Sequence, residues 1–332
     1  MILCFGVLIM DMFPSEKGMK LVEVPAFIPA PGGAAANVAV AVKRLGADSA
    51  FVGKVGNDQF GHYLCDVLKK DGVNVDGVIF DPYIRTTLNF HAIREDQTIE
   101  FLFYRNPGGD NSIRPEEINE ALFQKASVFH FDSLSTTDEP CRSALLKAVG
   151  LAKANRAVIS FDVNYRPVLW KSDAAAAEAV FEFASMANIV KLNDTEVKLF
   201  TGCSDIMEGA EKILDLGPDL VLVTTGAEGA CYLSKNGKCS GAVSACSAGP
   251  VIDTIGCGDT FIAGFLTKLT ECGKKPVELC KEELNDFCLF GNAAAAVTAT
   301  RKGCIPAMPA RSEVEQILRI ELPEHSGIKI GI

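Results

Sequence analysis

The residues best suited to chemistry lie in Val251–Phe265, where a glycine-rich turn precedes apolar residues that recur at helical spacing. The turn contains Gly256, Cys257 and Gly258, and Asp259 follows it. The first N–H groups of a helix lack intrahelical acceptors and lie at the positive end of the helix dipole, so they can bind a phosphate. Asp259 could accept a proton from a hydroxyl group. These residues indicate phosphoryl transfer, although a tight turn before an ordinary helix would also account for them.

Two further groups of polar residues lie where a predicted strand or turn ends. Asp11 follows the apolar strand predicted over Ile2–Met10, and ligands of open α/β sheets bind beyond the carboxyl ends of strands. An aspartate in a turn would fit the same pattern. Gly32 and Gly33 precede a small-residue helix that contains Asn37. This segment could bring bare backbone and an amide to a polar ligand, or it could only allow close packing against a sheet.

The order of the predicted elements indicates an α/β protein. From Pro115 onward, strands and helices alternate, which favours a parallel sheet with helices on both faces. Thr86–Ile93 and Thr98–Arg105 predict two strands around a turn, and with Met19–Ile28 they could form a small separate sheet. Asn193–Glu196 has the spacing of a capping box, which predicts the start of a helix.

Size and composition narrow the class of protein. The chain has 332 residues, enough for one large α/β domain or two modest ones, and a net charge of −10 without a basic run. We therefore expect neither nucleic acid nor a membrane as a partner. The twelve cysteines are scattered, and no secretory signal is evident, so we expect reduced thiols in a cytoplasmic protein. The sequence contains no Gly-x4-Gly-Lys-Ser/Thr segment, so we do not expect a P-loop NTPase. A dehydrogenase is poorly supported, because Gly256-Cys257-Gly258 lacks the third glycine of the dinucleotide-binding motif.

Two separate segments resemble the signatures of one family. Asp253–Phe261, with the sequence Asp-Thr-Ile-Gly-Cys-Gly-Asp-Thr-Phe, resembles the C-terminal signature of the ribokinase-like (PfkB) carbohydrate kinases, with Cys257 in place of the usual alanine. Gly33, Asn37 and Gly53–Gly61 resemble the N-terminal signature. The likeness extends over nearly the whole chain and is greatest to fructokinases, on residues that include Phe5-Gly6, Asp11, Arg105, Pro107 and Asp110.

The resemblance implies a fold and an activity. The fold would be a ribokinase-like three-layer α/β/α arrangement with a mainly parallel central sheet, formed by one kinase domain over residues 1–332, with a small β-sheet lid from residues 12–31 and 83–106. The activity would be ATP-dependent phosphorylation of a primary hydroxyl group, with D-fructose converted to fructose 6-phosphate. Asn89 stands in a lid strand that is usually apolar, so 2-keto-3-deoxygluconate kinase or ribokinase activity is the alternative. A sugar-binding regulator without catalysis, on the same fold, is the alternative from another class.

The resemblance also assigns roles to residues. Asp259 would be the catalytic base, and Gly256, Cys257 and Gly258 would form the anion hole, where the Cys257 thiol could confer sensitivity to oxidants. The residues implied in substrate binding are Asp11, Gly32, Gly33, Asn37, Arg105 and Arg166; those implied in nucleotide binding are Asn193, Thr224, Gly226, Gly229 and Asn292. Asn193 and Glu196 would order Mg²⁺ through water, and Asp253 with the Ile255 carbonyl would hold a monovalent cation such as K⁺. Two chains could pair through their lids as a homodimer.

Overall fold

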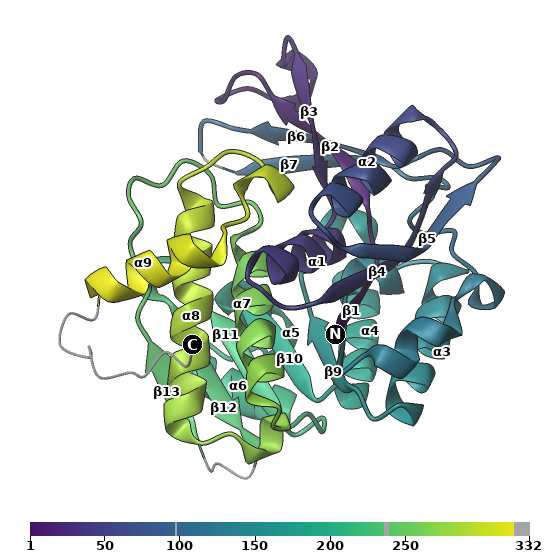
Figure 1. The fold of residues 1–332 in the computed structure, drawn as a ribbon. Helices are drawn as coiled ribbons and strands as arrows, with labels where there is room; N and C mark the ends of the chain where they lie inside the picture. The colour runs from purple at the N-terminus through teal and green to yellow at the C-terminus, as the bar shows by residue number, and fades with distance from the viewer. Residues whose placement is uncertain (97, 236–238, 322–332) are drawn as a thin grey trace.

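The structure, a computed structural model, describes residues 1–96, 98–235 and 239–321 and contains a nine-stranded sheet and a separate four-stranded sheet (Figure 1). In order across the large sheet, the strands are β13 (Ser240–Val243), β12 (Ala230–Ser234), β11 (Leu220–Thr224), β10 (Ile189–Asn193), β9 (Val158–Asp162), β8 (Val128–Asp132), β1 (Ile2–Phe5), β4 (Ser49–Gly56) and β5 (Asn74–Asp81). From β5 to β11 neighbouring strands are parallel, and β12 and β13 complete the sheet in antiparallel pairing.

Helices cover both faces of this sheet, because its strands are apolar on both sides. Along β1, Ile2 and Cys4 pack into one buried cluster, and Leu3 and Phe5 pack into the other. The first cluster is covered by α1 (Ala34–Arg44), α2 (Gln59–Lys70), α7 (Cys257–Cys272), α8 (Lys281–Ala299) and α9 (Arg311–Glu321). The second is covered by α3 (Cys141–Ala154), α4 (Asp173–Met186), α5 (Asp194–Thr201) and α6 (Ile206–Leu214). The predicted three-layer α/β/α fold with a mainly parallel sheet is confirmed.

Short 3-10 helices occupy several connections. They are η1 (Leu21–Glu23), η2 (Pro115–Glu117), η3 (Glu120–Lys125), η4 (Ser133–Thr136), η5 (Pro167–Leu169), η6 (Gly226–Glu228), η8 (Pro276–Glu278) and η9 (Ile305–Ala307). In the described part of the chain, no helix is both long and apolar enough to cross a membrane.

The small sheet lies beside the carboxyl ends of the central strands (Figure 1). Its order is β3 (Phe27–Gly32), β2 (Ile9–Pro14), β6 (Leu88–Ile93) and β7 (Ile99–Tyr104). The predicted lid segments, residues 12–31 and 83–106, contain β6, β7, all of β3 except Gly32, and half of β2, so we call this small sheet the lid. The strand predicted over residues 19–28 is wrong in extent, because residues 21–23 form η1 and the strand begins only at Phe27.

The prediction of one continuous strand over Ile2–Met10 is also wrong. The chain leaves the central sheet after Phe5 and enters the lid at Ile9. Gly6 makes this crossing possible with φ +149, and a Cβ there would lie 2.9 Å from the Ser135 Oγ and 3.0 Å from the Ala35 Cβ. One apolar stretch therefore supplies both a central strand and a lid strand, which places Asp11 in the lid sheet.

Candidate active site

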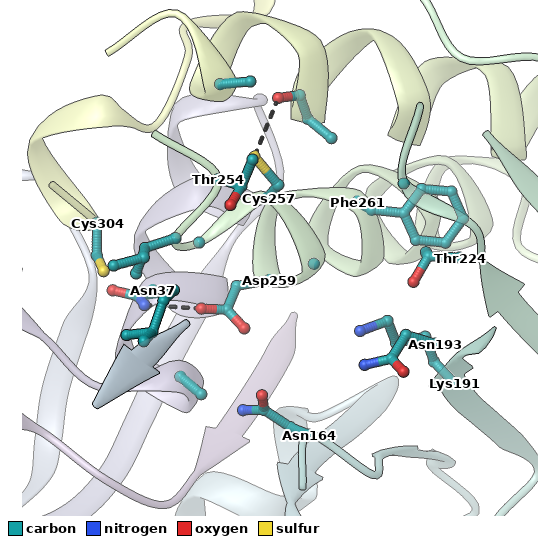
Figure 2. Close-up of a pocket in the computed structure, with 18 of the residues that line it drawn as sticks. Asn37, Asn164, Lys191, Asn193, Thr224, Thr254, Cys257, Asp259, Phe261 and Cys304 are labelled. Atoms are coloured by element: carbon teal, nitrogen blue, oxygen red, sulfur yellow. Dashed lines mark hydrogen bonds between the residues drawn. The ribbon is translucent and has the colours of Figure 1, made fainter. Parts of the chain in front are cut away.

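A cavity of about 900 Å³ lies at the carboxyl ends of the central strands, between the lid and the start of α7. The predicted site residues that line it come from distant parts of the sequence, as expected when the carboxyl ends of parallel strands meet at one edge. They are Asp11, Gly33, Asn37, Arg166, Asn193, Thr224, Gly226, Gly229, Ile255, Gly256, Cys257, Gly258, Asp259 and Asn292. Figure 2 shows Asp259 between Asn37 and Lys191 in this cavity.

The start of α7 is open toward the cavity. Gly256 is the N-cap residue, with φ +84, and it provides no side chain to accept from the first N–H groups. The Cys257 N–H donates to the Thr254 carbonyl at 3.2 Å, whereas no acceptor within the described residues pairs with the Gly258 N–H. The predicted anion hole therefore has fewer than three free N–H groups, because the Cys257 N–H is already bonded within the turn.

The carboxylate of Asp259 lies in the first turn of α7. Its Oδ2 accepts a hydrogen bond from the Asn37 Nδ2 at 2.7 Å (Figure 2). Burial raises the pKa of Asp259 to about 6, against the opposing effect of the Asn37 hydrogen bond. At neutral pH the group is ionised, and its pKa is close enough to 7 for it to accept a proton efficiently.

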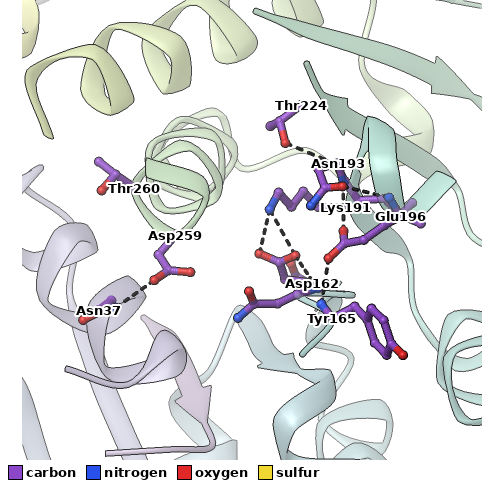
Figure 3. Close-up of polar contacts among 12 residues, drawn as sticks. Asn37, Asp162, Tyr165, Lys191, Asn193, Glu196, Thr224, Asp259 and Thr260 are labelled. Carbon is purple, nitrogen blue, oxygen red and sulfur yellow. Dashed lines mark hydrogen bonds and ion pairs between the residues drawn. The ribbon is translucent and has the colours of Figure 1, made fainter. Parts of the chain in front are cut away.

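Lys191 supplies a positive charge that sequence reasoning missed. The Nζ atom lies 3.1 Å from Oδ1 and 3.0 Å from Oδ2 of Asp162 (Figure 3). Burial lowers the pKa of Lys191, yet the charges of Asp162, Glu196 and Asp259 together raise it above its ordinary value, so the ammonium group stays charged. A Cβ at Gly258 would lie 2.9 Å from this Nζ, which places the ammonium group against the open turn of α7.

A signal for Lys191 existed in the sequence. It is a charged residue inside the otherwise apolar strand Ile189–Leu192, and buried charges are rarely tolerated without a partner or a function. Asn164 and His91 also line the cavity without having been predicted as site residues, and Asn89, the polar residue in a lid strand that is usually apolar, lines it as well. Asn164 adopts φ +38, a conformation that Asn tolerates better than most residues.

The lid end of the cavity carries Asp11, Gly33 and Asn37. Gly33 must be glycine, because it adopts φ +110 and a Cβ would lie 2.3 Å from the Val7 carbonyl oxygen. Gly32 does not line the cavity; it lies behind Asp11, and a Cβ there would lie 1.9 Å from the Asp11 Oδ2. Contact between Gly32 and a substrate therefore stays a prediction. What the structure shows is that Gly32 leaves room for the Asp11 carboxylate.

Arg105 is the second predicted substrate residue that does not line the cavity. Its buried guanidinium lies 2.8 Å from the Asp110 Oδ2 and donates to the Leu134 carbonyl at 2.8 Å. Arg166 does line the cavity, and its guanidinium lies over the lid residue Phe101, 5.5 Å from the ring centroid. Of the two predicted arginines, the structure brings Arg166 to the site.

The far end of the cavity collects the predicted nucleotide residues. Thr224 ends β11, Gly226 and Gly229 flank the turn that follows, and Asn292 lies on α8. The Asn292 amide donates to the carbonyl groups of Val243 and Ser244, at 3.0 Å each. Its hydrogen bonds therefore hold the strand edge beside the cavity, and a contact with the nucleotide stays a prediction.

Only some of the residues predicted to bind metal ions line the cavity. Asn193 and Ile255 line the cavity, but Glu196 and Asp253 do not. Both carboxylate oxygens of Glu196 accept backbone N–H groups, from Asn193 at 2.8 Å and Tyr165 at 2.7 Å (Figure 3). Within the described residues, no three His, Cys, Asp or Glu side chains are grouped to hold a metal ion. Because Mg²⁺ in kinase sites is held mainly by phosphates and water, contact of Asn193 and Glu196 with its waters stays a prediction.

Cys257 is less exposed to chemical attack than its place in the signature suggested. Burial raises the pKa of its thiol to about 12, and the charges of Asp253 and Asp259 act in the same direction. The Sγ donates to the Ala295 carbonyl at 3.6 Å. Because the thiolate is the reactive form, this environment argues against sensitivity to oxidants.

Known proteins are similar to this chain over most of its length. Residues 1–311 match the model of the pfkB family of carbohydrate kinases. A fructokinase of Solanum tuberosum is 42% identical over 320 residues, which cover 96% of each chain. A crystal structure of fructokinase from Xylella fastidiosa with bound ATP covers 96% of this chain and 98% of its own, with 32% identity and a TM-score of 0.87. Fructokinase from Vibrio cholerae O395, with bound fructose, ADP and calcium ion, covers 96% of this chain and 98% of its own, with 30% identity and a TM-score of 0.85.

Proposed function

The chain belongs to the pfkB family of carbohydrate kinases, and on this premise we propose that it transfers the γ-phosphoryl group of ATP to the primary hydroxyl group of D-fructose, forming fructose 6-phosphate. The observation that carries the proposal is the position of Asp259. Its carboxylate lies between the lid-side residue Asn37 and the ammonium group of Lys191, at the open start of α7 (Figures 2 and 3). A base at this position can reach an acceptor hydroxyl on one side while cations face the phosphates on the other.

In the proposed reaction, Asp259 accepts the proton as the hydroxyl oxygen attacks the γ-phosphorus and the bond to the β-phosphate oxygen of ATP breaks. The sugar is held beneath the lid by Asp11, Gly33 and Asn37. Closure of the lid would exclude water, which competes with the sugar as the acceptor. The predicted contacts of Gly32 and Arg105 with the sugar would require an indirect role, through Asp11 or the lid.

Charge on the transferring group is balanced from several directions. The Gly258 N–H and the Lys191 ammonium lie together at the start of α7, and with the Arg166 guanidinium, which also belongs to a residue lining the cavity, they would face the phosphates. Mg²⁺ bound with ATP would neutralise further negative charge, and Asn193 and Glu196 are the residues that we place around its waters. A monovalent cation such as K⁺ would lie beside Asp253 and the Ile255 carbonyl. Such preorganised charges supply most of the catalysis in phosphoryl transfer.

The experiment that tests the function is a set of initial rates with ATP and a panel of acceptors. D-fructose should give the highest kcat/KM, and ribose, 2-keto-3-deoxygluconate and fructose 1-phosphate should give lower values. Preference for ribose or 2-keto-3-deoxygluconate would replace fructose as the substrate and leave the kinase assignment intact. Saturable sugar binding without turnover of ATP would instead favour a sugar-binding regulator on the same fold.

We also propose that two copies pair through their lid sheets and that the protein is cytoplasmic. The outer lid exposes apolar side chains such as Ile28, Leu102 and Tyr104, which a partner chain would cover. Buried free thiols such as those of Cys4 and Cys65 suit a reducing compartment. Light scattering of the protein at micromolar concentration, with and without Leu102→Asp, tests the pairing.

A further inference from the structure

A buried polar cluster joins the two lid strands above the cavity. Asp11 lies in β2 and is the direct neighbour of Asn89 in β6, with His91 two residues further along β6. The Asn89 Nδ2 lies 2.9 Å from the Asp11 Oδ1, and the His91 Nε2 lies 2.8 Å from the same oxygen. All three side chains are buried, at 4%, 4% and 2% exposure for Asp11, Asn89 and His91, and all three residues line the cavity.

Asn89 Nδ2 donates to Asp11 Oδ1, and His91 Nε2, which lies 3.0 Å from Asn89 Nδ2, is in hydrogen-bonding contact with the same oxygen, so Asp11 Oδ2 is left for a different partner. Asp11 Oδ2 has one neighbouring donor within the described residues, the Cys304 thiol at 3.9 Å. A thiol is a weak donor, so this oxygen retains capacity to accept from a hydroxyl group. Gly32 lies directly behind Oδ2 and has no Cβ to displace it. The carboxylate is thus held from the lid side while one oxygen keeps its accepting capacity.

Two further polar atoms of the cluster have no partner within the described residues. They are Asn89 Oδ1 and His91 Nδ1, both buried. Buried polar atoms are nearly always hydrogen-bonded in folded proteins, and exceptions often mark functional sites. A sugar hydroxyl can donate to one atom and accept from another, so a bound sugar has the chemistry that would satisfy this cluster.

The His91 ring cannot easily move away from this arrangement. It stacks on Phe13 with a centroid distance of 4.9 Å and an interplanar angle of 6°, and it meets Phe101 edge-on at 5.1 Å. Phe101 also carries the Arg166 guanidinium over its ring. Packing therefore fixes the imidazole, and the imidazole in turn fixes Asp11.

We propose that Asn89 and His91 are specificity-determining residues, which orient the Asp11 carboxylate so that the acceptor is selected by a hydroxyl group that donates to it. The ligand class is a neutral polyhydroxylated sugar. This inference rests on the proposed function, since it concerns the acceptor of the same reaction. It goes further in assigning the selection to lid residues outside the phosphoryl-transfer machinery.

The test is a coupling experiment between residues and hydroxyl groups. Asn89→Ala and His91→Val should lower kcat/KM for D-fructose by about 10- to 100-fold, mainly through KM, because a hydrogen bond to a charged group is lost. The same variants are then assayed with monodeoxy-D-fructoses that lack the hydroxyl group at C1, C3 or C4. One of these analogues lacks the hydroxyl group that Asp11 binds. With that analogue, Asn89→Ala and His91→Val should lower kcat/KM by less than about threefold, because the hydrogen bond that Asn89 and His91 support is already absent.

Two variants separate specificity from damage to the lid. His91→Gln keeps a nitrogen donor and should recover most of the activity that His91→Val loses. Phe90→Leu changes the residue between the two, whose ring packs against Phe27 and Tyr104 instead, and it should change kcat/KM by less than about threefold for every sugar. Equal losses of the Asn89 and His91 variants with fructose and with all analogues would overturn the inference.

The failure of this inference can be told apart from failure of the proposed function. If the unmodified protein does not phosphorylate fructose, the proposed substrate is wrong. The same coupling experiment is then run with deoxy derivatives of the sugar that the panel identifies. If fructose is a substrate but every coupling is additive, the reaction assignment holds and the selective role of Asn89 and His91 is wrong.

Discussion

Helices α7 and α5 both begin at the edge of the sheet that faces the cavity, and each carries an acidic residue at its third position. In α5, the Asn193 side chain caps the Glu196 N–H at 2.8 Å, and the Glu196 carboxylate accepts the Asn193 N–H at 2.8 Å in return. In α7, the N-cap is Gly256, and Asp259 accepts from Asn37 and from no other described residue. The start of α5 has a capping side chain and a glutamate long enough to reach back to the N-cap, so its N–H groups are paired within the helix. The start of α7 has a glycine and the shorter aspartate, so it stays open to a ligand.

The largest effect should come from removing the free carboxylate of Asp259. Asp259→Asn should lower kcat by about 10²- to 10⁴-fold, because the acceptor hydroxyl loses its base. The amide can still accept from Asn37 at one oxygen, so ATP binding, measured by calorimetry, should change little. Near-normal turnover would show that the open start of α7 serves another purpose than proton transfer.

Asp259→Glu is the control that retains the charge and tests the comparison itself. Its longer side chain has the reach that Glu196 uses to close the start of α5, so it should turn back toward the N-cap and lose about as much kcat as Asp259→Asn. Activity close to that of the unmodified protein would mean that chain length does not decide between the two helix starts.

The same two helices show how far the sequence could predict the site. Capping of α5 and the glycine turn of α7 depend on neighbours a few residues apart, so local patterns predicted both. Lys191 and Asp162 are far apart in the sequence, and only the parallel pairing of β9 and β10 brings them together. The family resemblance implied that Arg105 contacts the substrate, but the folded chain shows its guanidinium paired with Asp110 and with the Leu134 carbonyl, 29 residues away in the sequence.

In the fold, too, local features were predicted and those that depend on distant contacts were not. Alternation of strands and helices predicted the three layers, since each element bears its own periodicity. The break after Phe5 was not predicted, because Ile2–Met10 is apolar throughout and its two halves are buried in different sheets. Hydrophobicity indicates that a segment is buried but not the layer in which it lies.

A second prediction concerns the protonation of Asp259. Burial raises its pKa to about 6, and only the ionised form can accept a proton. The value of kcat/KM for fructose, which reports the free enzyme, should therefore rise with pH, by about tenfold per unit below this pKa, and level off above it. Asn37→Ala removes the donor that lowers the pKa of Asp259, so the acidic limb of the pH profile should move to higher pH in this variant. A pH profile of kcat/KM for fructose measures both effects, and an unchanged acidic limb in Asn37→Ala would contradict the assignment.

The smallest effect is expected at the closed helix start. If Glu196 orders the waters of Mg²⁺ besides capping α5, Glu196→Gln should raise the Mg²⁺ concentration for half-maximal rate by about tenfold, because its charge is lost. The free energy of unfolding should fall by about 1–3 kcal/mol, because two backbone N–H groups lose a charged acceptor. Rates across a Mg²⁺ titration and urea unfolding measure the two effects separately.

Asp205→Ala distinguishes the two roles of Glu196, because Asp205 caps α6 by accepting the Glu208 N–H at 2.9 Å and does not line the cavity. It should cost about 1 kcal/mol of stability and leave the Mg²⁺ requirement unchanged. If Glu196→Gln behaves in the same way, Glu196 is a cap and nothing more. In that case the acidic residue of α7 acts on a ligand, whereas that of α5 only caps its helix. A shifted Mg²⁺ requirement would instead show that a helix start can be closed by its own side chains and still act on the nucleotide through its charge.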